Sequence, residues 1–351
     1  MAKEIVGLKI GASQLSAARV EQNGSAELLQ VAHGKLAPGI VQGGEVRDVA
    51  ALAEALKVFF SDHKLPKKNV RVGVASNRIG VRTIEIAGIL DPKQIANAVR
   101  FRAQEVLPIP LEEAVLDYQV LSESVDAEGQ PTKKVLLVVA YRDLIDALGA
   151  ACRDAGLKLA GIDLEAFALL RALTAPPAAG EERTALVAVT VGAERSTLAV
   201  SEGFTCEYTR VLDWGGASLT GSIARALGVE PEEAERIKHE LSLEGDAVPA
   251  GLTQEQALQA REALQLGLQS FARELVSSLQ FYQSQPDSLG IREVVLAGGT
   301  AKLGGLAAAL QRFIGVAVRV GDPLAGITAK KLRNAPSDPS LTVPIGLGMG
   351  R

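Results

Sequence analysis

Two short segments, one in each half of the chain, have the residue pattern of an anion-binding hairpin. The first, residues 5–18, turns at Gly11-Ala12-Ser13-Gln14, and the second, residues 186–199, turns at Gly192-Ala193-Glu194-Arg195. Each predicts a buried apolar strand, a turn of small or polar residues and a returning strand. A glycine in such a turn lets backbone N–H groups point outward and surround an anion. We therefore expect a pair of phosphate loops, although ordinary tight hairpins without a ligand would have the same pattern.

A further glycine-rich turn lies between a predicted strand and a predicted helix. Gly298-Gly299-Thr300 follows the apolar stretch 294–297 and precedes a helical pattern. This order lets a purine or ribose approach the backbone closely, with N–H donors from the helix N-terminus, although it also fits a plain strand-to-helix turn. Glu235 and Lys238 are three residues apart and therefore share a helix face. That spacing fits either a ligand contact or a surface ion pair of small energy.

The composition excludes several classes of protein. The chain has 351 residues, of which 47% are apolar and 22% charged, which is enough for two sizeable cores. A net charge of −4 and only 4% aromatic residues argue against a nucleic-acid partner. The longest purely apolar run, near 135–140, is far shorter than the ~20 residues of a membrane span, and the first residues lack a signal-peptide pattern. We expect a cytoplasmic protein that contacts the inner membrane only peripherally, through a partner.

Cysteine and histidine give no sign of a metal site. Cys152 and Cys206 are too few for a disulfide framework and lie in apolar surroundings, so we interpret both as core thiols. His33, His63 and His239 are scattered and lack the spacing of metal ligands.

The chain divides most naturally at residues 174–182, which are rich in proline and alanine and lie between the two hairpins. Before this boundary, Asp91-Pro92 should begin a helix as N-cap and first residue. After it, Thr253 and Gln256 form a capping-box pattern that opens a long helix ending near Tyr282. Strands and helices alternate along the chain, which indicates α/β architecture.

Several ordered segments resemble the PilM family of actin-like type IV pilus assembly proteins, which are relatives of the cell-division protein FtsA. The segments follow one another in the order of the family along essentially the whole chain: Arg82-Thr83-Ile84-Glu85-Ile86, Val99-Arg100-Phe101, Leu107-Pro108-Ile109-Pro110, Asp117-Tyr118-Gln119-Val120, 162–171, 215–220, 233–238, 296–301 and 345–348. An ordered set of this kind is far more specific than a lone glycine pair.

The resemblance implies a two-domain actin-like fold, in which a ribonuclease-H-like unit is duplicated. We expect the first domain at 1–175, with a small inserted α+β subdomain at about 80–155, and the second domain at 183–351. A return of the chain to the first domain near 330–351 is a further expectation.

The resemblance also implies a nucleotide site, with ATP or ADP as the candidate ligand. The residues that match the nucleotide-binding motifs of the family are Lys9, Gly11, Ala12, Ser13, Gln14, Gly192, Ala193, Gly215, Gly216, Glu235, Lys238, Gly298, Gly299 and Thr300. Glu165 lies near the position where an acid of the superfamily orients the attacking water, although as a helix-capping residue it would also complement the helix dipole.

The metal-binding positions of the family are altered in this chain. The pattern has Asp where this sequence has Lys9 and Thr190, and Lys where it has Ser16. Mg²⁺ prefers carboxylates or waters held by them, so we do not expect it here, nor hydrolysis. The Lys9 ammonium could instead lie near the phosphates and partly replace the charge of the metal, whereas Glu194 would repel them.

In PilM-like proteins, a groove between the inserted subdomain and the first domain takes the cytoplasmic N-terminal tail of PilN. By this resemblance the candidate partner-binding residues are Arg82, Arg100, Phe101, Leu107 and Pro108. The implied function is a scaffold that binds a PilN-like inner-membrane protein and other proteins of the pilus machine, and any nucleotide would be structural. The alternatives are an FtsA-like cell-division or polymerising ATPase and a relative of the sugar and acetate kinases.

Overall fold

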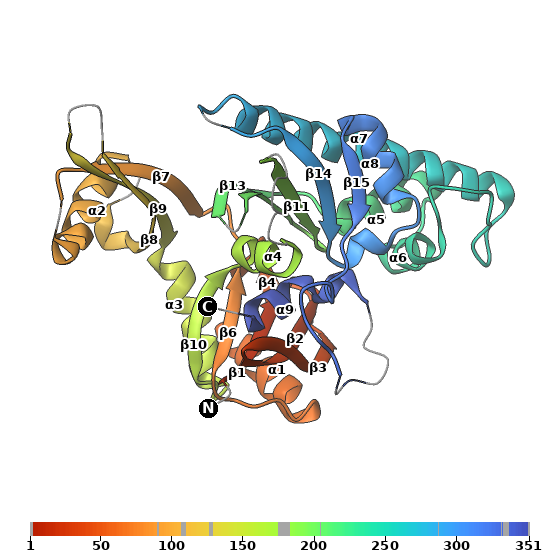
Figure 1. Cartoon of the computed structure of the whole chain (residues 1–351). Coiled ribbons are helices and arrows are strands. Elements are labelled where there is room, and N and C mark those ends of the chain that lie inside the picture. The colour runs from red at the N-terminus through yellow and green to blue at the C-terminus, as the bar shows by residue number, and fades with distance from the viewer. Residues whose placement is uncertain are drawn as a thin grey trace.

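The computed structural model describes residues 3–89, 91–106, 110–125, 129–174, 183–203, 205–286, 288–330, 332 and 337–349. Within these ranges the chain forms two five-stranded sheets flanked by helices and a three-stranded sheet that stands to one side of them (Figure 1). The expected linker at 174–182 lies outside the described residues except for Thr174, and so do Leu107 and Pro108.

The first sheet is built around the first hairpin. Its central strand β1 (Lys3–Ile10) turns at Gly11 into the antiparallel β2 (Gln14–Asn23) and pairs in parallel with β6 (Val70–Val74). The strand order is β10-β6-β1-β2-β3, with β10 (Leu159–Leu164) and β3 (Ser25–Lys35) at the edges. Consecutive residues of β1 are buried, as expected for a central strand that is covered on both faces.

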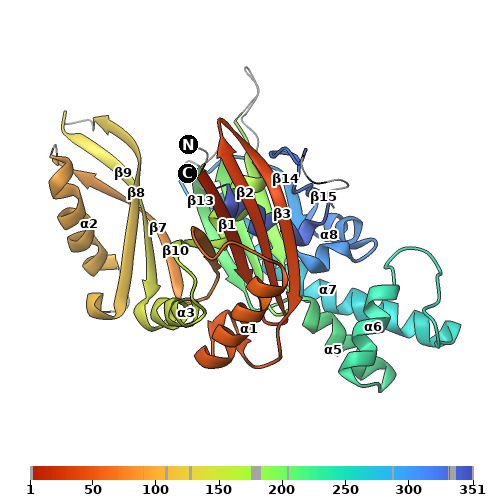
Figure 2. The same ribbon diagram turned by 90° about the horizontal axis from the view of Figure 1, so that it is seen from below.

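Helices from distant parts of the chain pack around the first sheet. α1 (Val49–Asp62) begins at Asp48, whose side chain accepts a hydrogen bond from the Ala51 N–H, and it packs against α3 (Arg142–Asp154). Figure 2 shows these two helices side by side. Before α1, β4 (Val41–Gln42) and β5 (Glu45–Val46) form a two-stranded ribbon.

The end of the described chain returns to the first sheet. After the short helix η3 (Pro339–Leu341), α9 (Thr342–Gly348) packs on α4 (Glu165–Leu173) and on β1 and β2. A Cβ at Gly346 would overlap the backbone of Ala168, so this close approach requires glycine. Val343 and Leu347 are almost completely buried in the core of the first domain.

The second sheet repeats the arrangement of the first. β11 (Ala185–Val191) turns at Gly192 into the antiparallel β12 (Ser196–Glu202) and pairs in parallel with β14 (Ile291–Ala297). The order is β13-β12-β11-β14-β15, with β13 (Thr205–Leu212) and β15 (Ala317–Val320) at the edges. Its packed helices are α5 (Gly216–Leu227), α6 (Pro231–Glu240), α7 (Gln254–Gln283) and α8 (Leu306–Ile314). The expected capping box of α7 is present, with reciprocal bonds between Thr253 and Gln256.

The inserted subdomain has its own small core. The sheet order is β7-β9-β8, from β7 (Ile79–Ala87), β8 (Ala114–Val125) and β9 (Pro131–Tyr141), and the short helix η1 (Leu111–Glu113) precedes β8. Ile95 and Val99 of α2 (Pro92–Val106) pack against this sheet. α3 behaves differently, because Leu144, Leu148 and Cys152 join the core of the first domain. By packing, α3 therefore contributes to the core of the first domain.

Among the described residues, no helix combines the length and the apolar character that crossing a membrane requires.

Candidate functional site

The two hairpins face one another across a small pocket of about 80 Å³. Lys9, Gly11 and Ala12 line it from the first hairpin, and Thr190 and the turn 192–195 line it from the second. Each turn is closed internally, because the Gly11 N–H donates to the Gln14 carbonyl at 2.9 Å and the Gly192 N–H donates to the Arg195 carbonyl at 2.8 Å. The predicted hairpins therefore exist and converge, but their glycine N–H groups are used within the turns.

Ser13 and Gln14, which the resemblance assigned to the first phosphate loop, are not among the residues that line this pocket. The Gln14 amide instead bonds the His33 ring at 2.7 Å, and the Ser13 carbonyl accepts from the Leu36 N–H at 2.9 Å. These two residues connect the hairpin to β3 and to the chain that follows it.

Lys9 forms an ion pair with Glu165 across the pocket. The Lys9 Nζ lies 3.1 Å from the Glu165 Oε2, and the two side chains are only 17% and 8% exposed. Lys9 is near the end of β1, and Glu165 is the first residue of α4. The Lys9 ammonium is thus paired with a buried carboxylate, and its expected place near phosphates stays a prediction. The same contact occupies Glu165, the weak catalytic candidate.

Arg195 is the second cation among the described residues that line the pocket; the sequence placed it in the second turn, but it was not among the residues expected to bind nucleotide. Its Nη2 lies 2.9 Å from the Asp213 carboxylate, whereas its buried Nε and Nη1 have no hydrogen-bond partner among the described residues. The Thr190 hydroxyl is likewise buried and without a partner there. A signal was present in the repeat, because Arg195 occupies the position in the second turn that Gln14 occupies in the first.

The tip of the β4–β5 ribbon closes one side of the pocket. A Cβ at Gly43 or Gly44 would lie against the Arg195 guanidinium, and both glycines have positive φ. The Glu194 carboxylate accepts a hydrogen bond from the Gly43 N–H at 3.0 Å. Glu194, expected to repel phosphate, therefore connects the second hairpin to the first domain.

The segments expected around an adenosine bond to one another. The Gly216 N–H and the Thr300 hydroxyl both donate to the Gly192 carbonyl, at 2.9 and 3.0 Å. Gly215 precedes α5 as its N-cap, and Gly298, with a φ of +88°, precedes η2 (Gly299–Lys302). A ligand that used these two donors would have to replace their bonds to Gly192.

Glu235 and Lys238 also interact, on the face of α6 that is turned toward α5. The Lys238 Nζ donates to Glu235 at 2.6 Å, to the Thr220 hydroxyl at 2.9 Å and to the Gly216 carbonyl at 3.1 Å. Burial alone would raise the pKa of Glu235, but the hydrogen bonds from Lys238 and Thr220 outweigh it and hold this pKa below its ordinary value. The contact of Lys238 with α5 makes the pair more than a surface ion pair.

The donor set of the pocket does not fit Mg²⁺. Among the described residues that line it, the carboxylates are Glu165, which pairs with Lys9, and Glu194, which accepts from the Gly43 N–H. No group of three or more His, Cys, Asp or Glu side chains in the described ranges could hold a metal ion. A divalent cation beside the Lys9 ammonium would meet electrostatic repulsion.

A much larger cleft, of about 840 Å³, lies on the other side of Val74, Ala75 and Thr197, which line both cavities. We call it the interdomain cleft. Its walls come from β6 and the following turn, the start of β7, the start of α4, β13 with the two residues after it, and α7. The lining residues are Val74, Ala75, Ser76, Asn77, Ile79, Val81, Leu164, Ala166, Thr197, Thr209, Arg210, Val211, Leu212, Asp213, Trp214, Ser270, Arg273 and Glu274.

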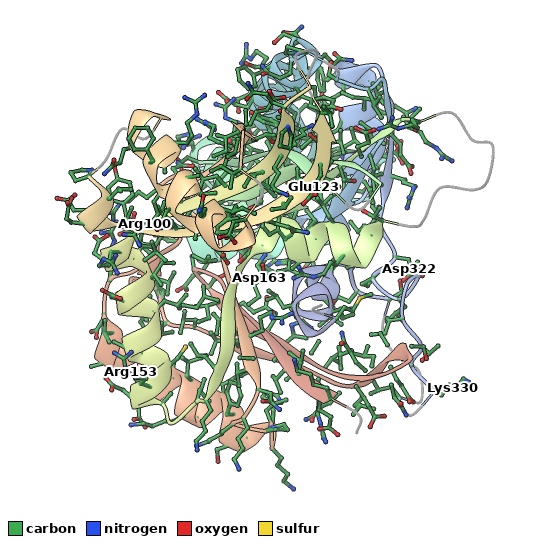
Figure 3. The ribbon with its side chains drawn as sticks, turned by 60° about the vertical axis from the view of Figure 1, so that its left-hand side comes forward. Arg100, Glu123, Arg153, Asp163, Asp322 and Lys330 are labelled. Carbon is green, nitrogen blue, oxygen red and sulfur yellow. The ribbon has the colours of Figure 1, made fainter. Side chains whose placement is uncertain are left out.

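The expected partner-binding residues that the structure describes, Arg82, Arg100 and Phe101, are not among the residues that line this cleft. Arg82 is exposed on β7 beside the lining residue Val81, and Arg100 is exposed on α2 (Figure 3). Phe101, at 64% exposure, lines a separate groove of about 610 Å³ within the inserted subdomain.

Comparison with known proteins identifies the family of this chain. A family profile described as type IV pilus assembly protein PilM matches residues 7–351. The chain belongs to the PilM family. A solved PilM–PilN type IV pilus biogenesis complex contains a chain similar to this one, with a TM-score of 0.83 and 26% identity over 99% of this chain and 98% of that one. The family assignment made from the ordered motifs is thereby confirmed.

More distant relatives share the actin-like fold. FtsA of Escherichia coli K12 is 28% identical over 276 residues, which cover 72% of this PilM-family chain and 64% of that protein. This chain thus spans less than two thirds of that relative. FtsA of Bacillus subtilis 168 is 23% identical over 80% of this chain and 70% of its own length. MreB5 of Spiroplasma citri bound to ADP has a TM-score of 0.56 at 14% identity, covering 99% of this chain and 95% of that one. The expected actin-like fold is confirmed.

Proposed function

We propose that this PilM-family protein is a scaffold of type IV pilus assembly that binds the N-terminal tail of a PilN-like inner-membrane protein in the interdomain cleft. The observation that carries the proposal is the cleft itself, which is bounded by the first domain, the inserted subdomain and the second domain. Membrane association would then come through the partner, and the protein would act on the cytoplasmic side. The whole-chain match to the PilM family favours this function over a kinase-like one.

The edge of β13 supports an extended occupant. Four consecutive residues of the strand, 209–212, line the cleft, together with Asp213 and Trp214, which follow it. Side chains of a strand alternate between its two faces, so a cavity that touches four strand residues in succession runs along the strand edge. Edge strands carry unpaired N–H and C=O groups, and extended peptides commonly add to them.

The lining chemistry suggests what the tail should contain. Val74, Ile79, Val81, Leu164 and Trp214 provide an apolar surface on several walls. Charged groups of both signs, Arg210, Asp213, Arg273 and Glu274, come from the second domain. A matching tail would be extended and would alternate apolar anchors with polar residues that meet this mixed charge.

Any nucleotide in this protein acts, in our proposal, as a structural ligand and not as a substrate. The support is that both carboxylates among the described residues of the pocket already have partners, Glu165 in the ion pair with Lys9 and Glu194 in its bond from the Gly43 N–H, whereas phosphoryl transfer needs Mg²⁺ to be organised. ATP and ADP would then bind with similar affinity.

Calorimetry tests the scaffold function. The synthetic N-terminal tail of the PilN-like protein from the same organism should bind with a Kd on the order of micromolar, as expected of a small extended interface. Ser270→Trp should weaken binding at least about ten-fold, because the indole would fill the cleft from the exposed surface of α7. Gln269→Trp is the matched control, since Gln269 is exposed on the same helix but does not line the cleft. Equal weakening by both variants, or no binding to the wild type, would contradict the proposed site.

A further inference from the structure

Two neighbouring loops of the first domain form an exposed basic surface. The first loop joins α1 to β6, and the second joins α3 to β10. The Lys158 N–H donates to the Lys67 carbonyl at 2.7 Å, and the Lys158 carbonyl accepts from the Val70 N–H at 3.1 Å, so the two loops are held together. We define the basic surface by its five exposed cations, which are Lys64, Lys67, Lys68, Arg153 and Lys158. Figure 3 shows Arg153 at the end of α3 that points away from the second domain.

The charge of the basic surface is not balanced by its surroundings. None of its five cations forms an ion pair with another residue that the structure describes. The carboxylates in the same segments, 62–69 and 153–160, are Asp62 and Asp154, which leaves these segments a net charge of +3. The whole chain carries −4, so the rest of the protein carries −7. Net charges of opposite sign on two parts of one protein orient it relative to a charged partner.

Lys64 has a backbone conformation that lysine rarely adopts. It follows the C-cap of α1 with a φ of +51°, and within the described ranges Lys64 and Asn69, both in this loop, are the non-glycine residues with positive φ. The corresponding left-handed positions at the ends of α3, α5 and α8 are occupied by Gly156, Gly228 and Gly315. Glycine avoids the steric cost of this conformation. Uncommon backbone conformations concentrate at functional sites, so a lysine here indicates that its side chain has a role.

The shape of the basic surface favours a broad partner over a peptide. None of its five cations lines the small pocket, the interdomain cleft or the groove beside Phe101. The two loops precede the starts of β6 and β10, whereas the interdomain cleft contacts Val74 and Ala75 at the other end of β6. An extended peptide binds in a groove or along a strand edge, but an anionic bilayer attracts protruding cations without either.

We propose that the basic surface contacts the anionic headgroups of the inner membrane and sets the orientation of the protein there. Each cation near an anionic bilayer adds a modest attraction, and several such attractions add together. Binding through five cations alone is weak, and the tail of the membrane partner reinforces it by holding the protein close to the bilayer. The presence of the membrane follows from the proposed function, whereas the contact itself requires no tail.

Sedimentation with lipid vesicles tests the contact on the full chain without any tail peptide. The wild type should bind vesicles of mixed phosphatidylglycerol and phosphatidylcholine at low salt and should not bind phosphatidylcholine alone. Added NaCl should release it, because salt screens exposed charges. Lys67→Gln with Lys68→Gln should reduce the affinity at least about ten-fold, since two attractions are lost. Lys67→Arg with Lys68→Arg keeps both charges and should retain the affinity.

Two further variants separate the basic surface from net charge and from stability. Arg225→Gln with Arg312→Gln is the matched control, because it makes the same change in net charge at exposed residues of the second domain. It should leave the affinity within about two-fold, since charges beyond the reach of the bilayer are screened. Lys64→Gly removes one cation and relieves the left-handed backbone, so it should weaken binding several-fold without lowering the thermal stability.

Failure to bind the anionic vesicles, equal binding to both kinds of vesicle, or equal losses in the Lys67→Gln with Lys68→Gln variant and in the matched control would overturn the proposal. Binding of polyglutamate through Lys67 and Lys68 without binding of vesicles would also overturn it, because the partner would then be an acidic polypeptide. The scaffold function is judged separately, by the peptide titration.

Discussion

Lys9 and Glu165 illustrate what can be inferred from single residues and what cannot. The sequence has a lysine at a position where the family resemblance leads us to expect an acid. It does not predict the partner of that lysine, because the pairing depends on how α4 begins beside β1, and these elements are far apart along the chain. The sequence places Arg195 in the second turn but does not show its surroundings: that its Nε and Nη1 are buried and lack a partner among the described residues depends on the turn at Gly43 and Gly44, which closes over it.

The Lys9–Glu165 ion pair should stabilise the folded protein only while both charges are present. Lys9→Met leaves the Glu165 carboxylate buried and uncompensated, so we expect the free energy of unfolding to fall by about 3–5 kcal/mol. The double variant Lys9→Met with Glu165→Gln removes both charges and should cost clearly less. Urea denaturation of both variants measures this difference. Equal losses would mean that the carboxylate finds another partner or water.

Glu235 predicts a pH dependence with a defined sign. Its folded-state pKa lies below the ordinary 4.5, because the bonds from Lys238 and Thr220 outweigh the effect of burial. Its contribution to stability is therefore present above pH 4.5 and is lost as the pH falls through the folded-state pKa. The stability difference between wild type and Glu235→Gln should shrink between about pH 6 and about pH 3 in denaturation experiments. A difference that stays constant with pH would rule out this role.

At the scale of elements, the strongest local signals predicted the structure best. The two hairpins, the strand before Gly298 and the capping box of α7 all form as the residue patterns indicated. Local patterns could not assign α3 to the correct core, because a helix with one apolar face can pack on either neighbouring sheet. Nor did they reveal the two-residue strands of the β4–β5 ribbon, which depend on tertiary contacts.

The capping box should stabilise α7 by a measurable amount. Thr253→Ala removes the bond that the Gln256 N–H donates to the threonine hydroxyl, and should lower the free energy of unfolding by about 1 kcal/mol. Thr253→Ser keeps an acceptor and serves as the control. Thermal denaturation followed by circular dichroism compares them, and a loss of the same size in both variants would indicate that the hydroxyl does not act as a cap.

At the scale of the whole molecule, the duplicated topology could be predicted from the family resemblance but not from local secondary-structure propensity. Interdomain contacts were beyond prediction, since they join single residues of separate domains. Examples are the bond from the Gly43 N–H to Glu194 and the pairing of Asn77 with Asp213. The interdomain cleft arises from the same juxtaposition, which explains why the described partner candidates Arg82, Arg100 and Phe101 are not among its lining residues.

The return of α9 makes the first domain sensitive to a change at the far end of the chain. Gly346→Ala would drive a methyl group into the Ala168 backbone and should destabilise the protein by roughly 3 kcal/mol. Gly161→Ala is the control, because a Cβ there meets nothing within 4 Å. Denaturant titration of the two variants tests the expectation, and equal stability would show that α9 can shift to accommodate the methyl group.

The same return has a consequence for how the protein is made. Val343 and Leu347 complete the core around β1, yet the ribosome synthesises them after every strand of the second sheet. Domains usually acquire structure from the N-terminus onward during translation. We therefore expect the core around β1 to be completed only after the second domain has been synthesised, so that in this protein the first domain would not finish folding before the second.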